Sequence, residues 1–104
     1  MRGGAEPRFD ETIHAPHRLR ICAMLSAVDR MEFGALRDEL DIADSVLSKQ
    51  LKVLTSAGYV MLDKPQGLGG KVRTWASLTG SGRRALQGHL AELRRLSEAA
   101  GLPG

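Results

Sequence analysis

The stretch DSVLSKQLKVLTSAGYV, from Asp44 to Val60, concentrates side chains whose types and spacing suit chemistry. Its leucines recur at intervals of four and three, which predicts a helix with one buried stripe. Most of the outward positions then carry hydroxyl, amide or ammonium groups: Ser45, Val46, Ser48, Lys49, Gln50 and Lys52. Such groups donate and accept hydrogen bonds, and ammonium groups attract anions. The pattern therefore predicts a binding surface, because it holds no nucleophile–base pair and no paired carboxylates.

The rest of the chain gives no catalytic pattern either. No Ser–His–Asp arrangement or phosphate loop is present, and the segment GLGG falls in a predicted hairpin turn rather than at the start of a helix. We therefore predict that the protein is not an enzyme and carries no cofactor.

Four residues could ligate a metal: His14 and His17, which are three positions apart, and the distant Cys22 and His89. Metal sites need clustered ligands, so ordinary surface or core histidines are the better interpretation and we predict no metal site. Cys22 would serve as a redox switch only if it were exposed and acidified by neighbours such as Arg18. A small buried hydrophobic residue is the simpler interpretation of Cys22.

Length and composition limit the class of protein. The chain has 104 residues, 42% of them hydrophobic and 26% charged, which predicts one ordinary globular domain. A single cysteine excludes an intramolecular disulfide and favours a reducing compartment. No apolar run approaches the roughly 20 residues that span a bilayer, and the first ten residues do not resemble a secretory signal. We therefore expect a cytoplasmic protein.

Charge is distributed unevenly along the chain. Residues 1–43 have a net charge of −2, residues 44–75 of +3 and residues 76–104 of +2. The most basic part therefore coincides with the patterned helix and the segment that follows it. This distribution favours a polyanionic partner over a merely solvated surface.

The elements that must position these groups follow from periodicity, capping residues and turn residues. The sequence predicts helices at about 15–28, 34–40, 44–57 and 80–100, a short strand at 31–33, and strands at 59–64 and 71–78 joined by the turn PQGLGG. Asp44 or Ser45 is expected to cap the third helix and Thr79 the last, while Gly58 suits a left-handed helix end. We expect residues 1–9 to form a flexible tail, 10–100 one domain with a C-terminal helix at about 80–100, and 101–104 a second tail.

The packing of these elements predicts the fold. A link of about three residues joins the second and third helices, as in a helix-turn-helix. A lone hairpin is marginal in water, so its apolar face must lie on the helices, where the short strand can extend it to three strands. The fold class is therefore mainly α with a small antiparallel β-hairpin (α+β), a winged helix-turn-helix in the order helix, strand, helix, helix, strand, wing, strand, helix.

Three segments resemble a known family. APHRLRICAML, SVLSKQLKVLTSAGYV and GGKVRTWASLTGSGRRAL are similar to the first helix, the recognition helix and the wing of short winged helix-turn-helix regulators of the MarR and ArsR kind. The resemblance covers about residues 13–96. It implies a regulator of transcription, with repression as the default, that binds a pseudo-palindromic operator in double-stranded DNA as a homodimer. The ArsR-type cysteine cluster and the long extra helices of full-length MarR proteins are missing, so control by a small-molecule effector is unsupported, though not excluded.

The resemblance places the 44–57 helix in the major groove. There Gln50 could bond bidentately to adenine, Lys49 could donate to guanine, and Val46 could contact a thymine methyl. Ser45 and Ser48 are small enough to let the helix approach a base edge or a phosphate. Which of these residues contacts a base rather than the backbone stays open at this point.

The wing is expected to reach the DNA backbone or the minor groove through Lys64, Gln66, Lys71 and Arg73. The alternative is that these are only solvated charges of a hairpin.

The last helix is expected to form the dimer interface through Leu86, Leu90, Leu93 and Leu96, because one recognition helix covers only a half-site. The alternative is that this helix packs only on its own core.

A second interpretation of the whole chain is a winged helix that binds protein or RNA without recognising an operator, since fold alone does not determine function. A protein-binding helix should expose apolar or acidic groups. The predicted face is polar and basic apart from Val46, which favours DNA.

Overall fold

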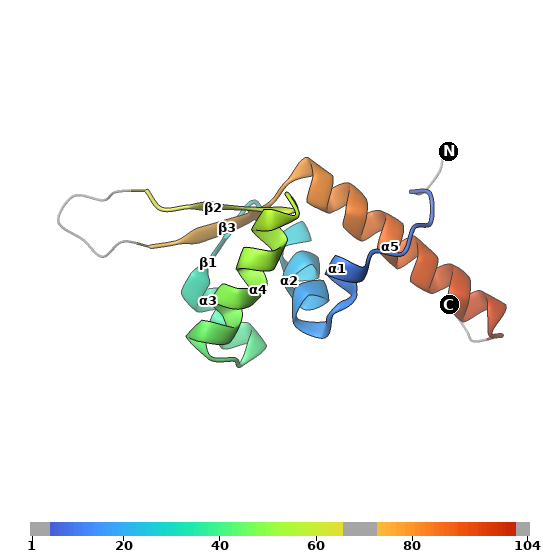
Figure 1. The fold of residues 1–104 in the computed structure, drawn as a ribbon, viewed down its shortest axis with the longest axis horizontal. Coiled ribbons are helices and arrows are strands. Elements are labelled where there is room, and N and C mark those ends of the chain that lie inside the picture. Colours follow the sequence, from blue (N-terminus) through green and yellow to red (C-terminus); the bar gives the residue numbers. More distant parts are fainter. Residues whose placement is uncertain (1–4, 66–72, 102–104) are drawn as a thin grey trace.

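The computed structural model describes residues 5–65 and 73–101, which form five helices and three strands (Figure 1). In chain order they are α1 (Glu11–His14), α2 (Pro16–Ser26), β1 (Met31–Glu32), α3 (Phe33–Leu40), α4 (Asp44–Ser56), β2 (Val60–Asp63), β3 (Trp75–Leu78) and α5 (Gly80–Ala99). The predicted fold class, mainly helical with a small antiparallel sheet, is confirmed. None of the described helices is both long and apolar enough to cross a membrane.

The start of the domain differs from the prediction, because a separate short helix, α1, precedes the first predicted helix. The Asp10 side chain caps α1 by accepting a hydrogen bond from the Ile13 amide at 3.0 Å. Ala15 then adopts an extended conformation, with φ −58° and ψ 135°. A residue that precedes proline is disfavoured in the α region, so Pro16 forces a break between α1 and α2. The predicted helix 15–28 is thus shorter at both ends.

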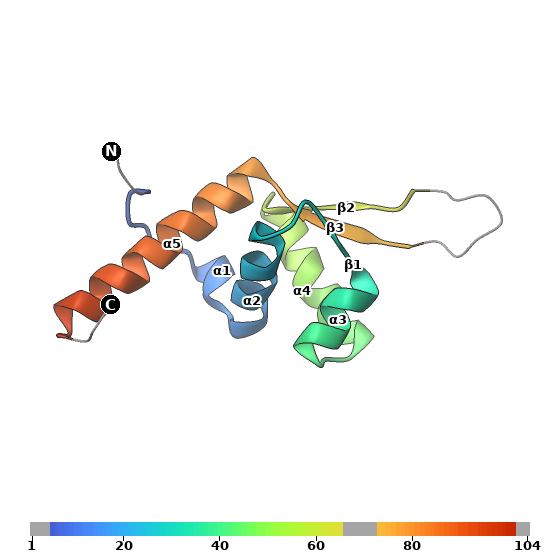
Figure 2. The same ribbon diagram turned by 180° about the vertical axis from the view of Figure 1, so that it is seen from behind.

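The sheet has the strand order β1-β3-β2, and both pairs are antiparallel. Met31 lies opposite Ala76, and Val60 lies opposite Leu78. The expected pairing of a short strand with the hairpin is therefore observed. The two longer strands extend away from the helices (Figure 2).

The connection between α3 and α4 is a tight turn. Asp41 ends α3 in the left-handed conformation at φ 54°, and Ala43 precedes α4 without any side-chain cap. The expectation that Asp44 or Ser45 caps this helix is therefore wrong. Asp44 is instead the first helical residue, where its negative carboxylate interacts favourably with the positive end of the helix dipole. Gly58 has φ 80° after α4, as its position predicted.

The core is aliphatic and centres on α2, which packs against α4, α5 and β3. Its buried side chains come from every helix and from β2 and β3: Ile13, Ile21, Cys22, Leu25, Leu36, Leu40, Leu47, Leu51, Leu54, Val60, Ala76 and Leu86. The three leucines of α4 lie in this core as the periodicity predicted.

Helix α5 starts in the core and then extends beyond it (Figures 1 and 2). Thr79 caps α5, as predicted, by accepting a hydrogen bond from the Gly82 amide at 2.9 Å. Residues 5–9 lie beside α5, where the Arg8 amide donates to the Gly88 carbonyl at 2.9 Å. Residues 5–9, which were expected to belong to a flexible tail, are therefore held against α5 by this hydrogen bond. Residues 1–4 and 102–104 are outside the described residues.

We predict that Gly82→Ala lowers the free energy of unfolding by about 1–3 kcal/mol, the usual range for overpacking. A Cβ at this position would overlap the Tyr59 carbonyl oxygen and lie 2.9 Å from Leu78 Cδ1. Gly80→Ala is the matched control, because its Cβ would meet only the flexible end of Arg84 at 3.4 Å. We expect that control to change stability by less than about 1 kcal/mol. Urea unfolding followed by circular dichroism measures both, and equal effects would contradict the packing described.

Candidate nucleic-acid interface

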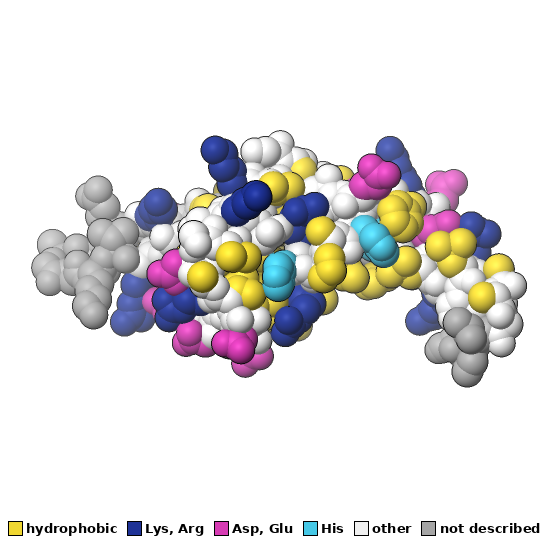
Figure 3. All heavy atoms as spheres, turned by 60° about the horizontal axis from the view of Figure 1, so that its bottom comes forward, with side chains coloured by type: hydrophobic (Ala, Val, Ile, Leu, Met, Phe, Trp, Pro, Cys, Tyr) yellow, Lys and Arg dark blue, Asp and Glu magenta, His cyan; other side chains and the backbone are white. Residues whose placement is uncertain are grey.

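The exposed face of α4 is defined by its buried face. At 100° per residue, Ser45 and Lys49 lie opposite Leu47, Leu51 and Leu54. Ser45, Ser48, Lys49 and Lys52 are exposed, and Val46 is half-buried. Lys and Arg side chains are spread across the face seen in Figure 3, and fewer Asp and Glu side chains lie among them. The ridge formed by Ser45, Lys49 and Lys52 presents a hydroxyl and two ammonium groups to solvent, and the nearby Asp44 carboxylate is paired with Arg37.

Gln50 lies on the flank of α4 rather than on this ridge. It is half-buried and accepts a hydrogen bond at Oε1 from Arg18 Nη1 of α2, at 2.8 Å. The bidentate adenine contact considered for Gln50 needs that same oxygen as an acceptor. The Arg18 bond engages one of the two lone pairs of Oε1, so the adenine contact of Gln50 stays a prediction. Arg18 is a residue that sequence reasoning did not place here, because 32 positions separate the pair.

Two of the candidate wing residues, Lys64 and Arg73, lie within the described residues. Lys64 is exposed just after β2. Arg73 is exposed too, but its Nε lies 3.3 Å from Glu32 Oε2 in an ion pair. Gln66 and Lys71 fall outside the described residues. An exposed ion pair of this kind is weak and easily exchanged for a phosphate, so Arg73 remains a candidate.

A groove of about 430 Å³ separates α4 from the sheet, and sequence reasoning did not predict it. Phe33, Leu51 and Leu62 supply apolar walls, and Lys52 and Lys64 bring an ammonium group from either side. The remaining lining residues are hydroxyl-bearing: Ser48, Thr55 and Thr74. Apolar walls between two cations suit a sugar–phosphate backbone, whose sugars are less polar than its phosphates.

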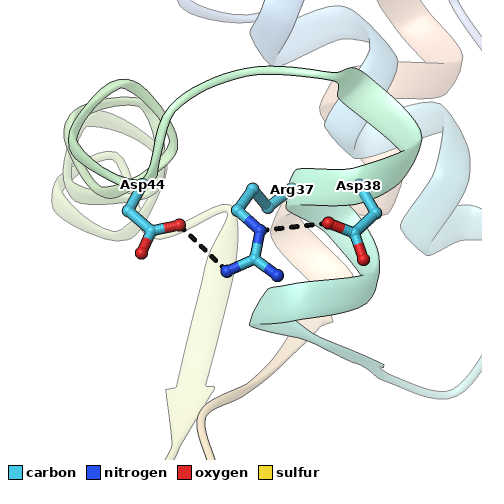
Figure 4. A network of polar contacts seen from close by, with 3 residues as sticks. All are labelled: Arg37, Asp38 and Asp44. Carbon is cyan, nitrogen blue, oxygen red and sulfur yellow. Dashed lines mark hydrogen bonds and ion pairs between the residues drawn. The ribbon is translucent and has the colours of Figure 1, made fainter.

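A charged brace fixes the start of α4 relative to α3 (Figure 4). Arg37 Nε lies 3.1 Å from Asp38, and Arg37 Nη1 lies 3.1 Å from Asp44 on the next helix. These hydrogen bonds, to Asp44 first and Asp38 second, raise the pKa of Arg37 above its ordinary value. Because the brace is solvent-exposed, its role is to orient the turn rather than to add much stability.

Comparison with known proteins identifies the family. A family model described as a winged helix DNA-binding domain matches residues 17–97. The chain belongs to this family. A curated relative, uncharacterized protein MJ0432 of Methanocaldococcus jannaschii, is 32% identical over 81 residues, which are 78% of this chain and 87% of the relative.

Solved structures that share this fold are described as regulators of transcription. A transcriptional regulator homologue from Pyrococcus horikoshii OT3 has the same fold, with a TM-score of 0.82 at 22% identity, over 89% of this chain and 91% of that one. A protein of Enterococcus faecalis V583 described as a MarR family regulator has a TM-score of 0.70 at 26% identity, over 86% of this chain and 79% of that one. Regulators of the ArsR family share the fold too. The resemblance to the MarR and ArsR groups is therefore confirmed.

The leucines of α5 divide into two groups within the winged-helix domain. Leu86 is only 3% exposed and belongs to the core of its own chain. The prediction that Leu86 lies in a dimer interface is therefore wrong. Leu90 and Leu96 are 45% and 44% exposed, and Leu93 is half-buried. The apolar side chains that need a cover are therefore those on the protruding half of α5.

A part-buried polar network, which the sequence did not reveal, joins the N-terminal segment to α5. The Asp10 amide donates to His89 Nδ1 at 3.0 Å, and Asp10 Oδ2 accepts from the Tyr59 hydroxyl at 2.5 Å. His89 Nδ1 is therefore unprotonated, so its Nε2 carries the hydrogen and donates to His14 Nδ1 at 3.1 Å. The bond to Asp10 raises the pKa of Tyr59, and burial lowers the pKa of His89.

The candidate metal ligands do not assemble in the described residues, where no group of three or more His, Cys, Asp or Glu side chains is placed to hold an ion. Cys22 is buried, and burial together with Asp10 raises its pKa to about 11 despite the opposing effect of Arg18. The condition set for a redox switch, an exposed and acidified thiol, is therefore not met.

We predict that acid destabilises the winged-helix domain through His89. The pKa of His89 lies below 6.5 in the folded state, first because of burial and second because of His14. The unfolded chain then binds more protons, so His89's contribution is fully present above about pH 6.5 and decreases as the pH falls below it. His89→Gln should lower the free energy of unfolding by about 1–3 kcal/mol at pH 7.5, because the hydrogen bonds of His89 are lost. Between pH 7.5 and 5.5, however, this variant should lose less stability than the wild type. Urea unfolding at both pH values tests this, and an unchanged pH dependence would refute it.

Proposed function

We propose that this protein regulates transcription by binding an operator in double-stranded DNA as a homodimer, with α4 in the major groove and the β2–β3 hairpin on the neighbouring backbone or minor groove. Membership of the winged-helix DNA-binding family supports DNA as the partner. The observation that carries the proposal is the ridge on α4, where exposed polar and basic groups lie opposite three buried leucines.

The ridge supports a division between base and backbone contacts. Lys49 lies at the centre of the exposed face, where its ammonium group can donate to guanine O6 or N7. Ser45 and Val46, in the first turn, can meet a base edge or a thymine methyl, as helix-turn-helix proteins do with the N-terminal part of this helix. Lys52 lies one turn later beside the groove and is better placed for a phosphate.

The groove supports a path for the DNA backbone. A phosphate between Lys52 and Lys64 would be neutralised from α4 and from the hairpin at once, which fixes the register of the helix in the major groove. Arg73 could join this contact by exchanging Glu32 for a phosphate. Lys71 and Gln66 remain proposed wing contacts.

Exposed leucines support a homodimer. Leu90 and Leu96, with Leu93 between them, form an apolar strip on the half of α5 that leaves the domain. A second copy related by a two-fold axis would cover this strip with its own and present two recognition helices to a pseudo-palindrome. A bound dimer would repress by blocking access of polymerase to the promoter.

Neutralising the ridge should weaken electrostatic binding to DNA. We expect Lys52→Gln to lower affinity for random duplex DNA and for a selected operator alike, and to reduce the slope of log K against log salt by about 0.9, the value for one lost phosphate neutralisation. Lys49→Gln should lower affinity for the selected operator more than affinity for random duplex DNA, because its ammonium group contacts a base. Arg95→Gln is the matched control, since it removes one charge from α5, where Arg95 pairs with Glu92 at 2.7 Å. Fluorescence anisotropy at several salt concentrations measures both. Salt-insensitive or absent binding by the wild type would favour a protein-binding module instead.

Charging the apolar strip should dissociate the dimer. We expect the double variant Leu90→Arg and Leu96→Arg to stay folded but monomeric, and to bind a two-half-site duplex about 100-fold more weakly because the second half-site no longer adds avidity. Met61→Arg is the control, because Met61 is 61% exposed on β2, away from α5. Sedimentation equilibrium gives the mass. A wild type that is monomeric at micromolar concentration, or a double variant that remains dimeric, would contradict this interface.

A further inference from the structure

Arg73 of the hairpin is paired with a carboxylate of its own chain. Its Nε lies 3.3 Å from Oε2 of Glu32, the last residue of β1. A charge-assisted hydrogen bond is usually shorter, at about 2.7–2.9 Å, so this contact is a loose one. The side chains of Arg73 and Glu32 are 66% and 33% exposed, so water reaches both groups. The pair is therefore weak and open to exchange.

Strand pairing holds Glu32 at the base of the hairpin. Glu32 lies opposite Trp75 in the β1–β3 ladder. The ladder continues with a hydrogen bond from the Phe33 amide to the Thr74 carbonyl at 2.8 Å. Side chains two positions apart share one face of a strand, so Arg73 reaches Glu32 diagonally from beside Trp75. The backbone of Glu32 thus stays in place, whereas the long stem of Arg73 allows its guanidinium group to change partner.

The two arginines closest to Glu32 in the sequence already have other partners. Arg30 lies over the Trp75 ring, 4.3 Å from its centroid. Arg37 is held by two aspartates in the brace shown in Figure 4. Within residues 5–65 and 73–101, Arg73 is the only cation that forms an ion pair with Glu32. The charge of Glu32 therefore acts chiefly on Arg73.

A DNA phosphate that approaches Arg73 meets the Glu32 carboxylate in one of two ways. If Arg73 leaves Glu32, the ion pair is lost. If Arg73 keeps Glu32 and binds the phosphate through its other N–H groups, two anions share one guanidinium group and repel each other. Both routes make the contact with DNA weaker than that of an arginine without a carboxylate beside it.

We propose that Glu32 limits the affinity of this protein for DNA, because its carboxylate competes with DNA phosphates for Arg73 and so weakens the wing contact. The inference rests on the proposed function, in which the β2–β3 hairpin lies on the DNA backbone or in the minor groove. Glu32 acts through Arg73 rather than on the DNA itself. Removing the carboxylate should therefore strengthen binding, whereas removing a merely structural contact would weaken it or leave it unchanged.

A double-mutant cycle on Glu32 and Arg73 tests the inference, with fluorescence anisotropy on a random-sequence duplex at several salt concentrations. Glu32→Gln keeps the shape of the side chain, and Glu32 makes no side-chain cap to α3 that the change would remove. This variant should bind about fivefold more tightly, the order expected for releasing a weak exposed pair, and the gain should shrink as salt screens the charges.

The second arm of the cycle removes the cation. Arg73→Gln should lower affinity and reduce the slope of log K against log salt by about 0.9 for each protomer. In the Arg73→Gln background, adding Glu32→Gln should change affinity by less than about twofold, because the competed cation is gone.

Asp29→Asn is the matched control for the loss of one negative charge. Asp29 is exposed in the turn before β1, and its carboxylate forms no ion pair in the part of the chain that the structure describes. This control should bind within about twofold of the wild type, because an exposed charge without a partner at the interface is screened. Circular dichroism establishes that each variant is folded. Glu32→Thr, whose side chain favours strands, removes the carboxylate if Glu32→Gln does not fold.

Five results would each overturn the inference: affinity lowered or unchanged by loss of the Glu32 carboxylate, a gain that does not depend on salt, the same gain in the Arg73→Gln background, an equal gain from Asp29→Asn, or wild-type binding by Arg73→Gln. All five leave the proposed function standing, because the contacts of α4 do not depend on this pair. A wild type that binds no duplex DNA would instead overturn the proposed function.

Discussion

The burial of Leu47, Leu51 and Leu54 fixes the rotation of α4 about its own axis, and every proposed contact with DNA depends on that rotation. All three side chains lie in the core, so a turn of 100° about the axis would expose leucine and bury lysine. Burying a leucine stabilises by about 1.5–3 kcal/mol, and an unpaired buried ammonium group costs more than that. The ridge of Ser45, Lys49 and Lys52 is exposed because the alternative orientations are costly.

The two flanks of α4 are held by arginines from other helices, and they are held differently. Arg37 binds Asp44 at the exposed start of the helix, where water competes for both partners. Arg18 binds Gln50 in a half-buried position, where water competes less and the hydrogen bond is stronger. The first contact therefore orients the turn between α3 and α4. The second holds the Gln50 side chain on the flank of α4 that faces α2.

The features that the sequence predicted correctly are those with local causes. Leucine spacing predicted the buried face of α4, Thr79 predicted the cap of α5, and Gly58 predicted the left-handed end of α4. The break between α1 and α2 has a local cause too, because Pro16 restricts Ala15, but the helical spacing predicted no helix before residue 15. The Arg18–Gln50 and Asp10–His89 bonds join residues 32 and 79 positions apart. No spacing rule connects such residues before the core has formed, so neither contact was visible in the sequence.

The Asp10 network connects the interface to the direction of α5. Asp10 caps α1, donates to His89 of α5 and accepts from Tyr59, which follows the end of α4. One residue thus ties three segments together in a half-buried site, where losing any one partner leaves an unsatisfied polar group. In a two-fold dimer formed through α5, the angle between α4 and α5 sets the distance between the two recognition helices. That distance must match the spacing of about 34–36 Å between half-sites one turn apart on DNA. In the proposed dimer, the same hydrogen bonds that hold the N-terminal segment on α5 would therefore limit which operators the two copies could span.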